Sequence, residues 1–162
     1  MAFDTIDWHF YVGYAVLGLM FFRCVWGFVG PAPVRFQALF TTPAQVFQYL
    51  KGFGLRAPSG TPGHNALGSW SVIAMIVSVS LQAVSGLFIE SDDFFESAPL
   101  AAYVSDTVID QMSWLHHLNA KVILFLVALH VVSILFYLIW KRENLITPMV
   151  TGWKWVKRKE LD

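Results

Sequence analysis

Charge and cysteine are both scarce in this sequence. Charged residues make up 14% of it, against ~25% in an average soluble domain, and this argues against a water-soluble fold. Cys24 is the one cysteine, so a disulfide within the chain is excluded. The first residues, MAFDTID, carry two acids and no base, so they are not predicted to be a cleaved secretion signal.

Apolar residues are abundant instead, at 56% of the chain. A helix needs ~20 mostly apolar residues to cross a bilayer, and three stretches meet this requirement, at about 8–30, 66–89 and 113–140. Aromatic residues reach 16%, as expected for a protein with aromatic belts at the membrane surfaces. We therefore predict one all-α integral membrane domain over 1–162, with three transmembrane helices in a bundle.

A shorter helix is predicted between the first two spans, at about 42–53. Its sequence begins with TTP, in which Thr41 or Thr42 can act as the N-cap and Pro43 suits the first helical turn. The apolar residues that follow share one helical face, namely Val46, Phe47 and Leu50. This pattern is typical of a helix that lies at the membrane surface.

The basic residues are segregated by this topology. With three spans, the 31–65 connection and the C-terminal tail lie on the same side of the membrane. That side carries Arg35, Lys51, Arg56, Lys141, Arg142, Lys154, Lys157, Arg158 and Lys159. The connections on the side where the chain begins contain no Lys or Arg, so the positive-inside rule makes the basic side cytoplasmic.

Acidic residues gather on the opposite, outer side. They are Asp4, Asp7, Glu90, Asp92, Asp93, Glu96, Asp106 and Asp110. Acids contribute little to the positive-inside rule, so their clustering has another origin. Two interpretations stay open, a solvated loop and a docking face for a basic soluble partner, whose encounter complementary charge would accelerate.

The five histidines are the most informative residues, since ionisable side chains in or near a membrane span suggest a functional site. His116 and His130 lie 14 residues apart in the third span, and this spacing turns them to within ~40° of each other at ~21 Å along the axis. His117 faces a different direction from His130. One helix can therefore present one imidazole near the outer surface and another deep in the membrane.

His9 lies at the outer end of the first span, at about the depth of His116 on the third. Two imidazoles on facing helices can hold one haem iron from both sides, an arrangement suited to passing single electrons. Gly13, one turn after His9, would leave room for a flat macrocycle. The chain has no CxxCH motif, which excludes covalent c-type attachment, and its histidines are too spread for one zinc ion.

Four segments of this chain resemble the bacterial cytochrome b561 and nickel–iron hydrogenase cytochrome b family. They are HFYVGYAVLGLMFFRCVWGFVGP, GHNALGSW, HHLNAKVILFLVALH and RENLITPMVTGWK, and together they cover almost the whole chain. The resemblance implies a haem b protein of the bacterial inner membrane that exchanges electrons between quinone and a partner redox protein. In such a membrane, the orientation given by the positive-inside rule places the N-terminus and the 90–111 segment in the periplasm and the C-terminus in the cytoplasm.

The same resemblance assigns roles to individual residues. His9 and His116 match the pair that holds the family's outer haem, and His130 matches one ligand of its inner haem. Arg23 matches an arginine near the haem or its propionates, although a cation snorkelling to the membrane surface is an equally good interpretation. His64 is a candidate for contact with a propionate or a quinone.

One departure from the family pattern concerns the inner haem. Its other ligand comes from a helix that precedes the first span of this sequence, and no such helix is expected here. Three explanations stay open: only the outer haem is bound, another chain supplies the ligand, or His64 supplies it. The third is the weakest, because His130 lies ~16 Å inside its helix whereas His64 precedes its own span.

The interpretation that follows is a membrane b-type cytochrome with one haem and a second as a candidate, working as a subunit of a larger electron-transfer complex. Another membrane subunit or a second copy of the chain is the expected partner. Two alternatives are retained. One is an oxidoreductase of the same fold that reacts directly with superoxide or quinone, and the other is a haem-free structural subunit.

Cysteine labelling tests the predicted orientation. In a Cys24→Ser background, a cysteine at Ser97 is expected to react with a membrane-impermeant reagent added to intact spheroplasts, because the 90–111 segment faces the periplasm. A cysteine at Thr151 is expected to react only after lysis. Labelling of position 151 from outside would reverse the orientation.

Overall fold

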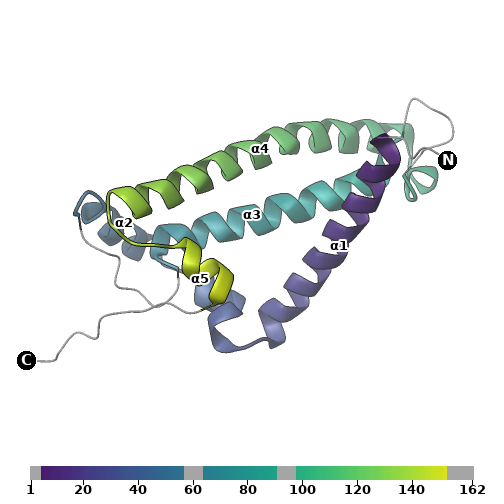
Figure 1. The fold of residues 1–162 in the computed structure, drawn as a ribbon. Helices are drawn as coiled ribbons and strands as arrows, with labels where there is room; N and C mark the ends of the chain where they lie inside the picture. Colours follow the sequence, from purple (N-terminus) through teal and green to yellow (C-terminus); the bar gives the residue numbers. More distant parts are fainter. Residues whose placement is uncertain (1–4, 57–63, 91–97, 153–162) are drawn as a thin grey trace, which may run out of the picture. The chain divides into compact units, whose positions relative to one another are not determined.

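The computed structural model describes residues 5–56, 64–90 and 98–152, and these form helices and turns without a strand. The helices are α1 (Thr5–Val29), α2 (Pro43–Lys51), α3 (Ala66–Ser85), α4 (Asp106–Ile139) and α5 (Ile146–Thr151), with short 3-10 turns beside them (Figure 1). α1, α3 with the turn that continues it, and α4 are long and apolar enough to cross a membrane. The predicted all-α membrane fold with three transmembrane helices is confirmed.

The third transmembrane helix begins at Asp106 rather than near Ser113. Its first two turns contain Asp106, Thr107, Asp110 and Gln111, and these polar residues interrupt the apolar run by which the span was predicted. Asp106 lies in the first turn, where a carboxylate favours helix formation. At 34 residues α4 is ~51 Å long, which exceeds the ~30 Å of hydrocarbon in a bilayer.

α2 starts with a capping box. The Thr42 hydroxyl accepts from the Gln45 amide at 3.3 Å, and the Gln45 side chain accepts from the Thr42 amide at 2.8 Å. Thr42, rather than Thr41, is therefore the N-cap. Thr41 instead donates to the carbonyl of Ala66 at 3.2 Å, and this bond ties the start of α2 to the start of α3.

The chain divides into two compact units, the first formed by residues 1–30 and 74–125 and the second by residues 31–73 and 126–162. In the first unit, a buried amide joins α3 to α4. The Asn119 side chain accepts from the Ser78 hydroxyl at 2.7 Å and donates to the Ser78 carbonyl at 2.8 Å and the Gln82 side chain at 2.7 Å. These bonds fix how far α4 is rotated against α3.

In the second unit, hydroxyl and amide groups connect α2, α3 and α4. Asn65 caps α3 by accepting from the Gly68 amide at 2.8 Å, and its NH₂ donates to the Tyr137 hydroxyl at 2.8 Å. The Tyr137 hydroxyl also bonds the Tyr49 hydroxyl of α2. Partial burial raises the pKa of Tyr49 above its ordinary value, so this hydroxyl stays protonated at neutral pH.

Aromatic rings surround the lysine that follows α4. Lys141 is only 4% exposed, and its Nζ lies 5.5 Å from the Phe53 ring centroid, 5.6 Å from that of Tyr137 and 5.8 Å from that of Tyr49. Such contacts stabilise a cation over ring faces. Lys141 is therefore buried within the second unit. A lysine at the end of an apolar helix would ordinarily be expected to be solvated.

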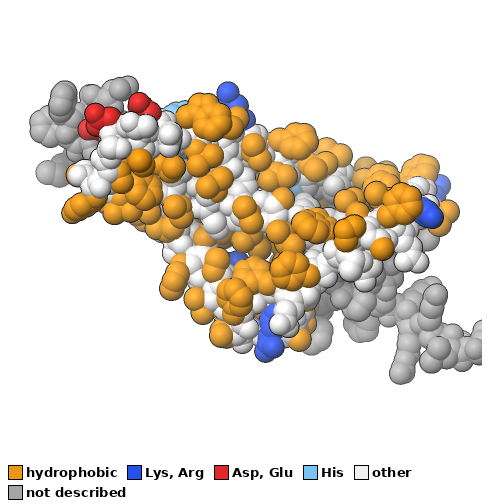
Figure 2. Space-filling view, turned by 180° about the vertical axis from the view of Figure 1, so that it is seen from behind, with side chains coloured by type: hydrophobic (Ala, Val, Ile, Leu, Met, Phe, Trp, Pro, Cys, Tyr) orange, Lys and Arg blue, Asp and Glu red, His pale blue; other side chains and the backbone are white. Residues whose placement is uncertain are grey.

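Apolar side chains dominate the surface. Figure 2 shows one face on which hydrophobic side chains are widespread and charged ones are few. On α1, Phe21 and Phe28 are each 73% exposed, and on α4 Leu124 is 70% exposed. Large exposed apolar side chains along these helices are what contact with lipid requires.

Candidate functional site

Two histidines from different helices meet in the first unit. His9 lies in the second turn of α1, and His116 lies on α4, with the ring centroids 6.1 Å apart and the ring planes at 71°. Figure 1 shows the first turns of α1 beside α4 and the end of α3. His9 is exposed and His116 is half-buried, so the pair lies at the edge of the unit rather than in its interior.

The separation of the two rings fits two ligands on one iron. Imidazole nitrogens bind metals at ~2 Å, and the ring centroid lies about 1 Å beyond the nitrogen, so ligands on opposite sides of a haem have centroids roughly 6 Å apart. Beside the pair, nothing lies within 4 Å of a Cβ built on Gly13. The predicted proximity of His9 and His116 and the space at Gly13 are both present.

The His116 ring is held by the last turn of α3. Its Nδ1 lies 3.1 Å from the Ser85 hydroxyl oxygen, and that hydroxyl lies 3.1 Å from the Gln82 carbonyl. With Nδ1 protonated, the Ser85 oxygen accepts from Nδ1–H while its own hydrogen goes to the Gln82 carbonyl, and that carbonyl also accepts a hydrogen bond from the ring. In this tautomer Nε2 keeps its lone pair, which is the form that binds a metal.

Gly86, directly after α3, approaches the same ring. A Cβ at this position would lie 3.1 Å from Cε1 and 3.4 Å from Nδ1 of His116, closer than ordinary van der Waals contact. A larger residue would therefore displace the imidazole. Sequence reasoning missed both Ser85 and Gly86, because a serine and a glycine near the end of a span are common in helix packing.

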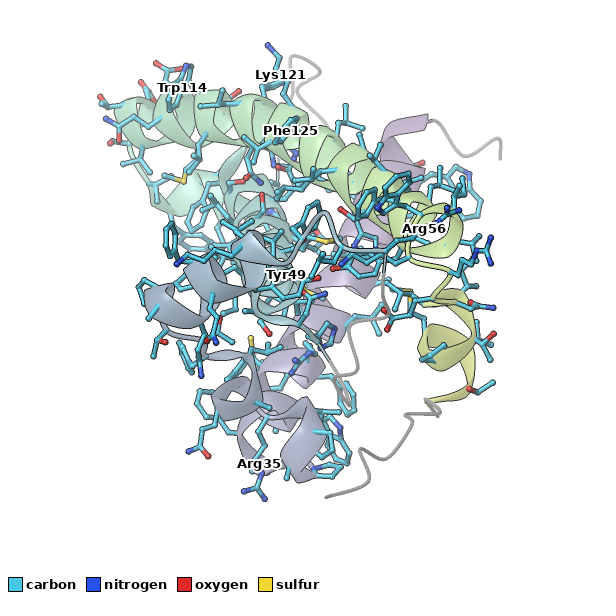
Figure 3. All side chains as sticks on the ribbon, turned by 90° about the vertical axis from the view of Figure 1, so that its left-hand side faces the viewer. Arg35, Tyr49, Arg56, Trp114, Lys121 and Phe125 are labelled. Atoms are coloured by element: carbon cyan, nitrogen blue, oxygen red, sulfur yellow. The ribbon has the colours of Figure 1, made fainter. Side chains whose placement is uncertain are left out.

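His117 faces away from the pair. Its Nδ1 lies 2.8 Å from the carbonyl of Ser113, one turn back on the same helix, and the residue is exposed. It lines an open groove on the surface of α4 together with Trp114 and Lys121, both of which project outward from the helix in Figure 3. These contacts agree with the prediction that His116 and His117 point in different directions.

The remaining predicted residues are divided between the two units. Arg23 lies half-buried on α1, while His64 and His130 belong to the second unit, the first exposed before α3 and the second half-exposed on α4. Among the described residues, His130 makes no hydrogen bond or ring contact like that of His116. The described part of the chain also contains no cluster of three or more His, Cys, Asp or Glu side chains suited to a metal ion.

Comparison with known proteins identifies a family. A family model described as prokaryotic cytochrome b561 matches residues 1–152. Neither the comparison with curated proteins nor the comparison with solved structures found a match.

Replacing the two adjacent histidines separately tests the site. His116→Ala is expected to abolish binding of the haem at this pair, because it removes an imidazole that faces His9. His117→Ala is expected to leave the haem in place, because this ring bonds its own helix and faces the groove. Haem content per chain, measured from the pyridine haemochrome spectrum, distinguishes the variants. Equal haem loss from both would contradict the assignment of the ligand to His116.

Proposed function

The chain belongs to the prokaryotic cytochrome b561 family, and on that basis we propose that it relays single electrons through a haem b held by His9 and His116. Family membership makes the chain an integral membrane b-type cytochrome of electron transfer. The ring pair at 6.1 Å is the observation that supports this choice of ligands.

The protein's part in the reaction is to bind and orient the cofactor. When bound, the haem supplies a one-electron Fe(III)/Fe(II) couple. His9 and His116 would be the two residues that hold the iron, with no position left for oxygen or another small ligand. Ser85 would accept from the Nδ1–H of His116 and so keep Nε2 available to the metal. Gly13 would leave room for the macrocycle beside α1.

Two electron partners are proposed for this site. One is quinone, which is dissolved in the membrane, and the other is a basic, water-soluble redox protein in the periplasm. The acids Asp106 and Asp110 are exposed in the first turns of α4, on the end of the helix that carries His116, and would attract such a protein. This placement assumes that α4 begins on the outer side of the bacterial inner membrane and that the basic tail is cytoplasmic.

A second membrane subunit, or a second copy of this chain, is proposed to cover His130. This imidazole is half-exposed within the apolar stretch of α4, and no described residue hydrogen-bonds it. A polar side chain left toward lipid is costly. A neighbouring helix that supplied a haem ligand or a hydrogen bond would remove this cost, with Arg23 and His64 as candidates for contact with propionates or quinone.

The absorption spectrum of the purified protein tests the haem assignment. We expect a reduced-minus-oxidised spectrum of a low-spin b-type cytochrome and complete removal of the haem by acid–acetone, because no covalent attachment exists. A well-folded chain without haem absorption would refute the proposal and favour the structural-subunit alternative. Rapid oxidation of quinol or superoxide by the purified protein alone would favour the oxidoreductase alternative.

Native mass spectrometry after mild-detergent purification tests the assembly. We expect a complex that contains a second membrane chain, because His130 has no partner among the described residues. His130→Leu, which removes the polar group, is expected to keep the haem at His9 and His116. A fully active monomer with two haems would contradict the proposed partner and make His64 the candidate for the missing ligand.

A further inference from the structure

We propose that Ser85 is a positioning residue that sets the orientation and electron-donating strength of His116, and thereby lowers the reduction potential of the bound haem. This inference rests on the proposed function. It concerns a residue that does not touch the iron and acts only through the ring of His116.

The first support is the direction of the hydrogen bonds. Ser85 is 1% exposed, so no water competes for its hydroxyl. In the tautomer that binds a metal through Nε2, the hydroxyl gives its only hydrogen to the Gln82 carbonyl and offers a lone pair to Nδ1–H of His116, beside the bond that the ring makes with the same carbonyl. A metal-binding histidine whose other N–H is given to an acceptor becomes a more basic ligand. A more basic ligand stabilises the ferric state over the ferrous one and lowers the potential.

The second support is a comparison with another buried serine of the same helix. Serine in a helix commonly bonds a carbonyl of its own preceding turn, and Ser85 does so with Gln82. This preference alone does not explain why the Ser85 hydroxyl also contacts an imidazole. Ser78, two turns earlier and 6% exposed, bonds Asn119 instead. The two serines therefore have different roles. Ser78 joins α3 to α4, and Ser85 contacts His116.

The third support is the lack of space around the ring. A Cβ at Gly86 would lie 3.1 Å from Cε1 of His116 and would require the ring to shift by a few tenths of an ångström, so the imidazole is closely packed on the side of the Ser85 hydroxyl. Confinement and the hydrogen bond act on the same edge of the ring. Together they hold Nδ1 toward α3 and leave Nε2 for the iron.

The test is a redox titration of the whole haem-loaded protein and three variants. Ser85→Ala is expected to raise the midpoint potential, because the ring loses the Ser85 oxygen as an acceptor and keeps only the Gln82 carbonyl. A shift of up to about tenfold in the reduction equilibrium corresponds to ~59 mV for a one-electron couple. Ser85→Thr keeps the hydroxyl and is expected to stay near the wild-type potential. Ser69→Ala is the matched control, which loses a hydroxyl that is 0% exposed on the same helix and makes no hydrogen bond with a described residue, and it is expected to leave the potential unchanged.

The outcomes separate this inference from the proposed function. A wild-type protein without haem refutes the proposed function itself. A haem-loaded Ser85→Ala protein with the wild-type potential refutes only the role of Ser85, and so does an equal shift in Ser69→Ala. If Ser85→Ala fails to retain haem, Ser85→Cys decides, because its sulfur is a weaker acceptor of similar size. An intermediate rise in its potential supports the inference, and an unchanged potential overturns it.

The electron paramagnetic resonance spectrum adds a readout that depends on ligand orientation. Gly86→Ala places a methyl group against the ring and is expected to change the anisotropy of the low-spin ferric signal, because that signal depends on the orientation of the axial imidazole planes. Gly18→Ala, on α1 with nothing within 4 Å of its Cβ, is the control. Identical signals from wild type and Gly86→Ala would show that the glycine does not confine the ligand.

Discussion

Lipid tails are as apolar as leucine, so the hydrophobic effect does not press helices together within a bilayer. The first unit depends instead on the amide of Asn119, which is 5% exposed and makes three hydrogen bonds with α3. These bonds fix both the position of α4 along its axis and its rotation about that axis, relative to α3. Because His116 lies three residues before Asn119 on the same helix, the amide also determines that this imidazole meets Ser85 and that its neighbour His117 does not.

The sequence alone was sufficient to predict features that depend on one kind of residue repeated over a long stretch. Apolar runs predicted the three transmembrane helices, and helical spacing separated His116 from His117. The position of His9 at the start of its span predicted that it could meet His116, and the ring contact agrees. The roles of His9, His116 and His130 as ligands stay predictions.

The residues that sequence reasoning missed have their effect only through a partner on another helix. Asn119 is one polar residue in a long apolar segment, and Gly86 is one of 11 glycines. The identity of Asn119 or Gly86 does not by itself show which side chain that residue contacts. The burial of Lys141 has the same origin, since two of its three aromatic neighbours, Tyr49 and Phe53, come from a distant part of the sequence. A basic residue after an apolar helix suggests only a solvated end.

The direction of α3 has a further electrostatic consequence. The Gln82 carbonyl that orients the Ser85 hydroxyl belongs to the last turn of α3, and the carbonyl end of a helix carries about half a negative charge. His116 therefore lies at the negative pole of a 20-residue helix. A positive charge gained near such a pole is stabilised by about 0.3–1 kcal/mol. If α3 ran in the opposite direction, the same two histidines would lie in a field of opposite sign.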